Sequence, residues 1–275
     1  MPRLAVVGHV EWVDFIPVAR MPRQGEVLHA EAGYIHDLRA SLFSERRAGP
    51  WRRLHHVDRD GNLYPTHGLG PVAGYLRIGR GDRFDHLVSM SSPQRGLDLW
   101  RESHLDPGDP RWAERYTCGD LNTSLIKASS GRTVLVQHNV ASPRPYDRLN
   151  LVAGTKGTYR DFPPGIYLDG QAGEEAYVGI ERFRERFEHQ WWTEYGNRAR
   201  ELGGHGGADF IMCWRLIQSM LTGTVPDLDV YDAATWSVVG PLSVDSVRLG
   251  SVPVAVPDFT RGRWSGARAV VGSVA

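Results

Sequence analysis

Residues 26–36 repeat their chemical character with a period of two. Successive side chains of a strand point to opposite faces of its sheet, so this period predicts a long strand. One face would carry Val27, His29, Glu31, Gly33 and Ile35, and the other Leu28, Ala30, Ala32 and Tyr34. The face with His29 and Glu31 would either line a polar site or face solvent.

Two pairs of neighbouring segments indicate β-hairpins further along the chain. Residues 120–128 and 132–140 are strand patterns joined by Ser-Ser-Gly, and residues 148–153 and 158–160 are joined by Gly-Thr-Lys-Gly. Short connections that contain glycine are typical of hairpins. Successive paired strands predict an antiparallel sheet.

Helical patterns lie between and after these strands, at residues 71–78, 174–202, 208–221 and 228–250. The charged segment 44–62 indicates a loop, and residues 93–116 indicate an irregular insertion. Strands and helices do not alternate regularly. We therefore expect an α+β fold with an open, mainly antiparallel β-sheet and helices packed on one face.

Composition narrows the range of partners. The 32 basic and 32 acidic residues give a formal net charge of zero, which argues against a nucleic acid or an anionic membrane surface as the main partner. No apolar run approaches the roughly 20 residues that span a bilayer, and the first residues lack a signal-peptide pattern. We expect a cytoplasmic protein whose two cysteines, Cys118 and Cys213, are buried thiols.

The stretch Asn62-Leu-Tyr-Pro-Thr-His-Gly-Leu-Gly-Pro71 is the strongest candidate for chemistry. Histidine transfers protons near neutral pH, and the hydroxyl of Tyr64 can donate or accept a hydrogen bond. Thr66 is a residue type that caps helices, so a helix could begin at His67. The alternative is a turn rich in proline and glycine that carries a surface histidine.

Three further residues are candidates for ligand contacts. Arg52 can form several directed hydrogen bonds, although a solvated surface arginine is the ordinary alternative. The prolines of Ser142-Pro-Arg-Pro-Tyr146 fix an extended loop that presents Arg144 and Tyr146. His205 lies within Gly203-Gly-His-Gly-Gly207, before a helix, where it either faces a ligand or is a spectator in a flexible turn. Adjacent His55 and His56 are poorly spaced as metal ligands, and we expect no metal.

Seven segments, taken in order, resemble one family. They are Gly25-Glu-Val-Leu-His-Ala-Glu-Ala-Gly-Tyr-Ile-His-Asp-Leu-Arg39, the stretch 61–71, Arg80-Gly-Asp-Arg-Phe-Asp85, Gly119-Asp-Leu-Asn-Thr-Ser124, the loop 142–146, the glycine run 203–207 and Val256-Pro-Asp-Phe-Thr260. Together they are similar to glycoside hydrolase family 109, in the Gfo/Idh/MocA oxidoreductase-like superfamily. The resemblance covers roughly residues 25–264 and implies the fold of the C-terminal domain of that superfamily.

The resemblance implies an NAD-dependent α-N-acetylgalactosaminidase. In that family NAD oxidises C3 of the sugar, a base removes the C2 proton, the aglycone is eliminated, water adds and the hydride returns. The pair of carboxylates used by ordinary glycosidases is then not required. The resemblance places substrate contacts at Arg52, at the run Tyr64, Pro65, Thr66 and His67, and at Tyr146, with His205 in a family motif. Tyr64 and His67 are the expected catalytic residues.

The sequence also departs from this family. No G-x-G-x-x-G loop occurs, so the Rossmann domain that would bind NAD is expected to be missing. Residues 1–25 resemble the start of a PfkB (ribokinase-type) sugar kinase, residues 26–264 form the substrate domain, and residues 265–275 form a tail. Alternatives are a non-catalytic carbohydrate-binding remnant and, less favoured, a sugar kinase. The substrate would be a glycoside with terminal N-acetylgalactosamine, and the chain could form a homo-oligomer.

Overall fold

We analysed a computed structural model of the chain, which describes residues 26–266 except 46–48, 171–175, 182 and 184–186. The kinase-like segment 1–25 and the tail from residue 267 therefore lie outside the described residues. In the part of the chain that is described, no helix is long and apolar enough to cross a bilayer.

An eight-stranded sheet forms the centre of the described chain. Its strands are β1 (Val27–Ile35), β2 (Phe84–Ser91), β3 (Asn122–Ala128), β4 (Thr133–Asn139), β5 (Leu151–Gly154), β6 (Gly157–Asp161), β7 (Pro164–Leu168) and β8 (Val254–Ala255). Their order across the sheet is β7-β6-β5-β1-β4-β3-β2-β8. Neighbours run antiparallel except β1 and β4, which are parallel. The predicted open, mainly antiparallel sheet is confirmed.

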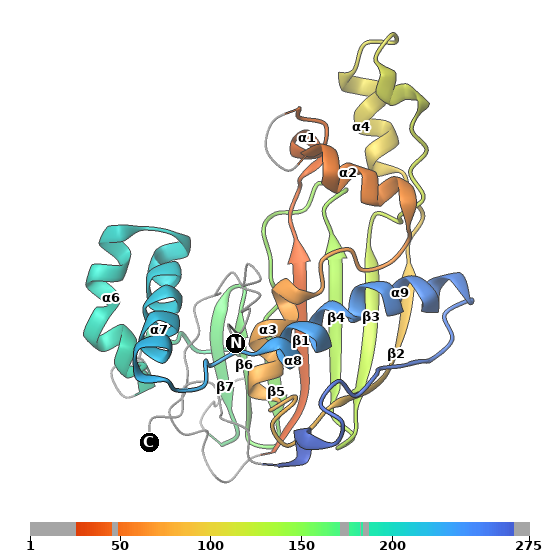
Figure 1. The fold of residues 1–275 in the computed structure, drawn as a ribbon. Coiled ribbons are helices and arrows are strands. Elements are labelled where there is room, and N and C mark those ends of the chain that lie inside the picture. Colours follow the sequence, from red (N-terminus) through yellow and green to blue (C-terminus); the bar gives the residue numbers. More distant parts are fainter. Residues whose placement is uncertain (1–25, 46–48, 171–175, 182, 184–186, 267–275) are drawn as a thin grey trace.

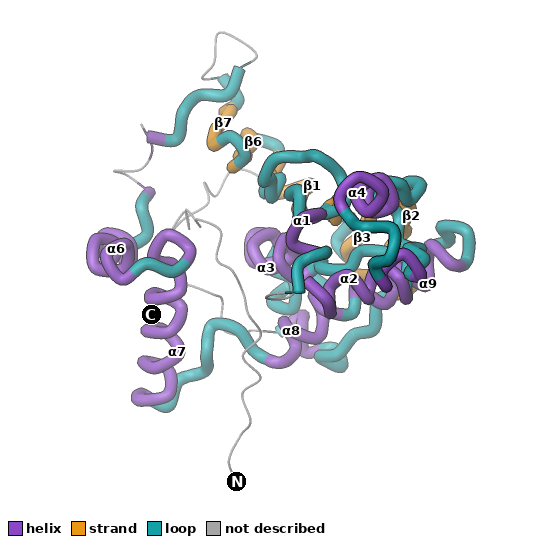
Figure 2. Tube along the Cα trace, turned by 90° about the horizontal axis from the view of Figure 1, so that it is seen from above, coloured by secondary structure: helices purple, strands orange, loops and turns teal. Residues whose placement is uncertain are grey.

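Helices gather at three places around this sheet (Figure 1). They are α1 (Arg39–Leu42), α2 (Gly49–Asp58), α3 (Thr66–Tyr75), α4 (Gly96–His104), α6 (Gln190–Leu202), α7 (Ala208–Thr222), α8 (Val230–Ser237) and α9 (Val239–Arg248). Helices α3, α8 and α9 cover one face of the sheet, and α1, α2 and α4 lie beyond one end of its strands. Seen from above, α6 and α7 form a hairpin to one side (Figure 2).

The faces expected for the central strands are those observed. Ala30, Ala32 and Tyr34 of β1 are buried, and they pair with Val134, Val136 and His138 of β4. Because β1 and β4 are parallel, both strands end at the same edge of the sheet, where their inward polar residues, Tyr34 and His138, are register partners. Alternating burial thus sets Tyr34 and His138 side by side beside the main core.

Helix α3 packs very closely against β1 because it carries a glycine at the contact. A Cβ atom on Gly68 would lie 2.7 Å from the backbone nitrogen of Gly33 and 2.9 Å from Cβ of Ala32. Both distances are shorter than real Cβ contacts allow. The absent side chain therefore brings the start of α3, including His67, against the end of β1.

Several local predictions were wrong. Residues 44–62 include the ten-residue helix α2, and residues 93–116 include α4. The start of α4 is stabilised from a distance, because the Asp120 carboxylate accepts the backbone N–H groups of Arg95 and Gly96 at 3.1 and 2.8 Å. Such a cap from another segment is invisible in the local sequence.

The helix after Tyr64 also differs from its prediction. It begins at Thr66, with Pro65 at the N-cap and no side-chain cap, so Thr66 is not the N-cap of a helix that starts at His67. Pro71 lies inside the helix rather than at its start. Proline has no backbone N–H, so position 71 cannot donate to the carbonyl of His67 four residues earlier, and α3 lacks that hydrogen bond.

Two alanine substitutions in α3 test the close packing. We expect Gly68→Ala to lower the free energy of unfolding by about 1–3 kcal/mol, because the added methyl group overpacks against the backbone of β1. Gly74→Ala is the matched control: position 74 is exposed with open space around it, so alanine should be neutral or stabilise the helix by up to about 1 kcal/mol. Urea unfolding measures both, and equal effects of the two variants would contradict the packing argument.

Candidate functional site

Tyr34 is the centre of a polar and aromatic cluster at the end of β1. Its ring lies 4.7 Å from Tyr64, 4.8 Å from His67 and 4.8 Å from His36, all edge to face, and is stacked at 6.2 Å on His138. These distances join ring centroids and fall in the range of favourable aromatic pairs. Four side chains from three segments therefore converge on one tyrosine.

Tyr64 and His67 reach this cluster from the turn into α3. Tyr64 precedes the helix, and its backbone N–H donates to the side-chain oxygen of Asn62 at 3.3 Å. His67 lies in the first helical turn and is buried. The two rings lie 5.5 Å apart at an interplanar angle of 29°. The turn thus places a phenol and an imidazole next to one another and next to Tyr34.

Helix α2 supplies the second wall of the site. Trp51, Arg52, His55 and His56 follow the spacing i, i+1, i+4 and i+5, so they share one helical face. All four line a pocket together with Tyr34 and Tyr64. The Arg52 guanidinium donates from Nη1 to the Tyr34 hydroxyl at 2.8 Å. Its central carbon lies 5.4 Å from the Tyr64 ring, within cation–π range.

The loop before β5 closes the cluster on another side. Its backbone is fixed to the end of β1, since Ile35 and Asp147 exchange backbone hydrogen bonds. Arg148 is buried and lies over the rings of Tyr34 at 5.3 Å and Tyr146 at 4.6 Å, and its Nε donates to the Tyr146 hydroxyl. Tyr146 is 50% exposed, and its ring contacts His36 at 5.6 Å. Tyr146 is therefore exposed on its loop, as predicted, and Arg148 fixes the position of its hydroxyl.

Burial keeps two histidines of the site uncharged near neutral pH. Desolvation, helped by the neighbouring His55, lowers the pKa of His56 to about 4. Desolvation also lowers the pKa of His138 far below its ordinary value, with His56 and Arg52 adding to the shift. Neutral imidazoles offer one donor and one acceptor each, which suits hydroxyl groups. No aspartate or glutamate is among the described residues that line the pocket.

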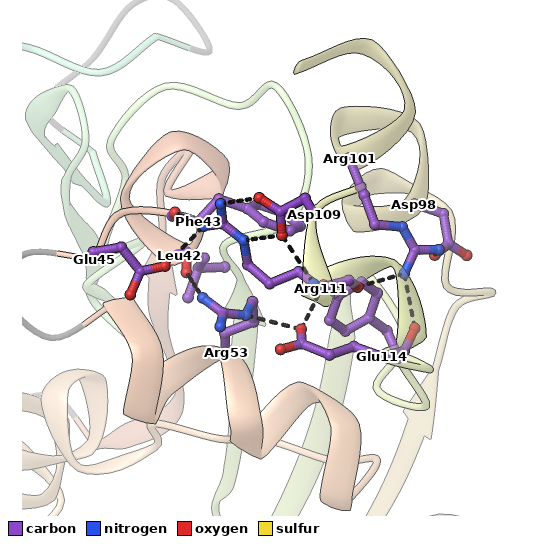
Figure 3. Close-up of polar contacts among 10 residues, drawn as sticks. Leu42, Phe43, Glu45, Arg53, Asp98, Arg101, Asp109, Arg111 and Glu114 are labelled. Atoms are coloured by element: carbon purple, nitrogen blue, oxygen red, sulfur yellow. Dashed lines mark hydrogen bonds and ion pairs between the residues drawn. The ribbon is translucent and has the colours of Figure 1, made fainter. Parts of the chain in front are cut away.

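A partly buried ion pair between Arg53 and Glu114 anchors α2 to neighbouring segments (Figure 3). Arg53 donates from Nε to the Glu114 carboxylate at 2.8 Å and from Nη1 to the Leu42 carbonyl at 2.7 Å. The Tyr116 hydroxyl donates to the same carboxylate at 2.8 Å, and Arg101 donates to the backbone carbonyl of Glu114. Arg53 therefore links α2 to Leu42 at the end of α1 and to Glu114 in the insertion.

The predicted site residues are only partly brought together. Arg52, Tyr64 and His67 all contact Tyr34, and Tyr146 is linked to the same cluster through Arg148. Pro65 and Thr66 form the turn that positions their neighbours. His205 lies instead between α6 and α7, where its Nδ1 faces the Asp209 carboxylate at 2.9 Å. Its role in substrate binding stays a prediction.

Sequence reasoning missed the residue at the centre of the cluster. It considered the His29 and Glu31 face of the first strand as either a polar site or a solvent-facing surface, and those side chains lie on the face opposite Tyr34 and contact one another at 3.8 Å. Tyr34 was placed on the inward face without a role, and His36, His138 and Arg148 were not selected. The sequence feature that could have identified them is a polar residue at the end of an apolar strand face: Tyr34 follows Ala30 and Ala32, and His138 follows Val134 and Val136. Among the described residues, no group of three or more His, Cys, Asp or Glu could hold a metal.

The fold is shared with sugar and inositol dehydrogenases. The apo form of levoglucosan dehydrogenase superposes with a TM-score of 0.58 at 17% identity, covering 85% of this chain and 60% of that one. An inositol dehydrogenase homolog from Azotobacter vinelandii, complexed with NAD+, gives a TM-score of 0.50 at 16% identity, covering 84% and 58%. The described residues therefore form a domain of the Gfo/Idh/MocA C-terminal type.

The particular family follows from the sequence comparisons. The family model described as "Glycosyl hydrolase 109, C-terminal domain" matches residues 13–266. Proteins named glycosyl hydrolase family 109 protein are 57% identical over 240 residues in Solibacter usitatus and 50% identical over 241 residues in Saccharopolyspora erythraea, each covering 87% of this chain. The chain belongs to glycosyl hydrolase family 109. It spans 55% and 52% of those relatives, about half their length.

Glu114→Ala tests the ion pair between Arg53 and Glu114. We expect the free energy of unfolding to fall by about 2–3 kcal/mol, because Arg53 keeps a buried charge without its partner. Lys156→Ala is the control, since Lys156 and Asp169 form an exposed pair at 3.4 Å, and we expect a change below about 0.5 kcal/mol. Urea titration of both variants gives the comparison, and a loss in Glu114→Ala no larger than in Lys156→Ala would refute it.

The pH dependence of stability tests the buried state of His56. The unfolded chain binds a proton at this residue near its ordinary pKa of 6.5, whereas the folded chain does so only at about 4. The free energy of unfolding therefore falls as the pH drops from about 6.5 to 4, by about 3 kcal/mol at the acid end. His56→Gln removes this titrating group, so the unfolding free energy of the variant should depend less on pH than that of the parent protein. Parallel curves for the two proteins would show that His56 is not buried as described.

Proposed function

We propose that this chain is the sugar-binding part of a glycoside hydrolase that acts, with NAD, on terminal α-N-acetylgalactosaminides. The observation that carries the proposal is the convergence of Arg52, Tyr64 and His67 on Tyr34 at one end of the sheet. Membership of family 109 supports the hydrolase class. The specific sugar and the need for NAD rest on the family resemblance.

The chemistry of the cluster suits a sugar. Sugar hydroxyls both donate and accept hydrogen bonds, and phenols and neutral imidazoles can do the same. Aromatic faces can also pack against the C–H groups of a sugar ring. The buried state of His56 and His138 keeps them neutral at physiological pH, so they match hydroxyls better than they match an anion.

Tyr64 and His67 are the residues to which we assign proton transfer. Their rings are adjacent, and both touch Tyr34, whose hydroxyl accepts from Arg52. A proton leaving a sugar hydroxyl at C3, or the carbon at C2, would have a phenol and an imidazole within the same cluster. Arg52 would orient Tyr34 and stabilise negative charge on it. Tyr146, half exposed at the edge, would contact the bound ring.

The pair of acidic residues used by most glycosidases has no counterpart in the pocket. Those enzymes need two carboxylates on either side of the scissile bond. The described pocket is lined by aromatic, histidine, arginine and aliphatic side chains, without aspartate or glutamate. This composition supports a reaction that moves protons at C2 and C3 rather than one that protonates the glycosidic oxygen from a carboxylic acid.

The described residues do not fit the phosphates of a dinucleotide. A dinucleotide site of the usual kind is a glycine-rich turn that leads from a strand into a helix. Within the described ranges, the run Gly203–Gly207 joins two helices, α6 and α7, and α3 follows a turn without that glycine spacing. We therefore assign NAD to none of these residues and derive no step through it.

A second candidate function is sugar binding without catalysis. It is favoured by one observation, that this chain spans about half the length of its relatives. Calorimetric titration of the chain with NAD separates the two. Saturable NAD binding supports the glycosidase. Sugar binding with no NAD binding and no turnover supports a carbohydrate-binding module.

Substitutions at the two proton-transfer residues test the role assignment. In an assay that contains NAD and in which the parent protein releases nitrophenol from nitrophenyl α-N-acetylgalactosaminide, we expect Tyr64→Phe and His67→Ala each to lower that release by about a hundredfold or more, the usual contribution of a positioned acid or base. The rate is followed by absorbance. His104→Ala is the control, since that histidine is exposed on α4 and stacks only on Trp100.

Activity of both variants at the level of the parent protein would refute this assignment. His205→Ala in the same assay tests the prediction that remains for the glycine run. A loss there without a loss at Tyr64 and His67 would move the site to the α6–α7 hairpin.

A further inference from the structure

One buried cation at the edge of the cluster has no part in the proposed chemistry. Arg148 is only 4% exposed, although arginine is almost never fully buried unless it is paired. Two tyrosine rings lie against it. The central carbon of its guanidinium is 5.3 Å from the ring centre of Tyr34 and 4.6 Å from that of Tyr146. Arg148 therefore contacts both the buried ring at the centre of the cluster and a half-exposed ring at its edge.

The backbone is fixed on both sides of Arg148. Before it, Asp147 exchanges two backbone hydrogen bonds with Ile35 at the end of β1. After it, the backbone N–H of Leu149 donates to the Asp147 carboxylate at 2.7 Å. Leu149 and Asn150 have φ angles of 60° and 43°, in the left-handed region that residues other than glycine rarely adopt. Such a conformation persists only where the surrounding structure enforces it, so this turn sets the direction in which Arg148 leaves the chain.

Tyr146 is much less enclosed than Arg148. It lies in the loop between β4 and β5, half of its surface is exposed, and its ring meets those of His36 at 5.6 Å and Phe162 at 5.7 Å. The Nε of Arg148 donates to its hydroxyl. A buried side chain on a fixed turn thus holds the tip of an exposed side chain on a loop. The hydrogen bond restricts the rotation of the Tyr146 ring before any ligand binds.

We propose that Arg148 is a positioning residue for sugar binding, which acts through the hydroxyl of Tyr146. The inference rests on the proposed function, in which Tyr146 contacts the bound ring. A side chain that is already fixed loses less freedom when a ligand binds, and the ligand therefore binds more tightly. Arg148 makes no contact with the sugar in this proposal. The ring of Tyr34 serves to hold the guanidinium in place.

A double-mutant cycle tests this role through the affinity for a single sugar ring. Arg148→Met removes the hydrogen-bond donor but keeps a long side chain that can pack against the two rings. Tyr146→Phe removes the hydroxyl and keeps the ring. Calorimetric titration with methyl α-N-acetylgalactosaminide gives the affinity of each variant. Each single variant should bind this sugar about three- to tenfold more weakly than the parent protein, which is the cost of immobilising one further side chain on binding.

The variant that carries both substitutions separates a positioning role from other roles. If Arg148 acts through the Tyr146 hydroxyl, the double variant should bind within about twofold of Tyr146→Phe alone, because the hydroxyl is already absent. A direct contact between Arg148 and the sugar, or a general structural role, predicts instead that the two losses multiply. Arg148→Lys keeps a charged donor and should recover part of the affinity when Tyr146 is present, but none of it in Tyr146→Phe.

A second arginine–tyrosine pair supplies a matched control. Arg263 donates from Nη2 to the Tyr231 hydroxyl, and its guanidinium lies 4.9 Å from the centre of that ring. Neither residue is among the described residues that line the pocket. Arg263→Met therefore breaks the same kind of contact away from the cluster, and it should leave the affinity for the sugar within about twofold of the parent protein. Thermal unfolding of each variant verifies that it is folded.

Three results would overturn the positioning role and leave the proposed function standing. They are an unchanged affinity in Arg148→Met or in Tyr146→Phe, losses that multiply in the double variant, and a loss in Arg263→Met as large as that in Arg148→Met. If the parent protein does not bind the sugar at all, the proposed function itself fails, and this inference fails with it.

Discussion

The close approach of α3 to β1 at Gly68 is the constraint on which the site depends. Position 68 would bring a Cβ into the backbone of Gly33, so only glycine allows this spacing. His67 directly precedes Gly68 on α3, and Tyr34 directly follows Gly33 on β1. The backbone contact therefore fixes the ring contacts directly. A wider spacing would separate His67 and Tyr64 from Tyr34, and it would also weaken the contacts of α3 with the main core.

The second wall of the site is supported independently of the sheet. Helix α2 does not pack on β1 through a glycine; it is anchored by Arg53, whose side chain is shared between the Glu114 carboxylate and the Leu42 carbonyl. Adjacent residues on one helix thus serve two purposes: Arg53 points to the anchor and Arg52 to Tyr34. The position of Arg52 therefore depends on a partly buried ion pair, which is stable only when both of its partners are present.

The fold was more predictable than the site. Strands such as β1 and the β3–β4 hairpin were recognised because period-two burial is a local property, readable along 26–36 and 120–140. Helix α4 was missed because its cap, Asp120, lies outside it in sequence. The role of Tyr34 was missed for a related reason: its neighbour His138 is set by the parallel pairing of β1 with β4. Nothing near residue 34 indicates that pairing. Tyr64, His67 and Arg52 were selected from their residue types and local sequence, and the family resemblance added their expected roles, but their mutual contacts could not be derived from spacing alone.

The absence of carboxylates from the described pocket and the neutrality of its histidines belong together. A carboxylate beside His56 or His138 would favour the protonated imidazole and raise its pKa. With burial unopposed, both rings stay neutral, and the permanent charge in the pocket wall is the guanidinium of Arg52. That charge is directed at the Tyr34 hydroxyl. Any negative charge that develops during the proposed reaction would therefore be best stabilised at Tyr34. Under the proposed function, the reacting carbon of a bound sugar would lie next to that hydroxyl rather than near His56 and His138.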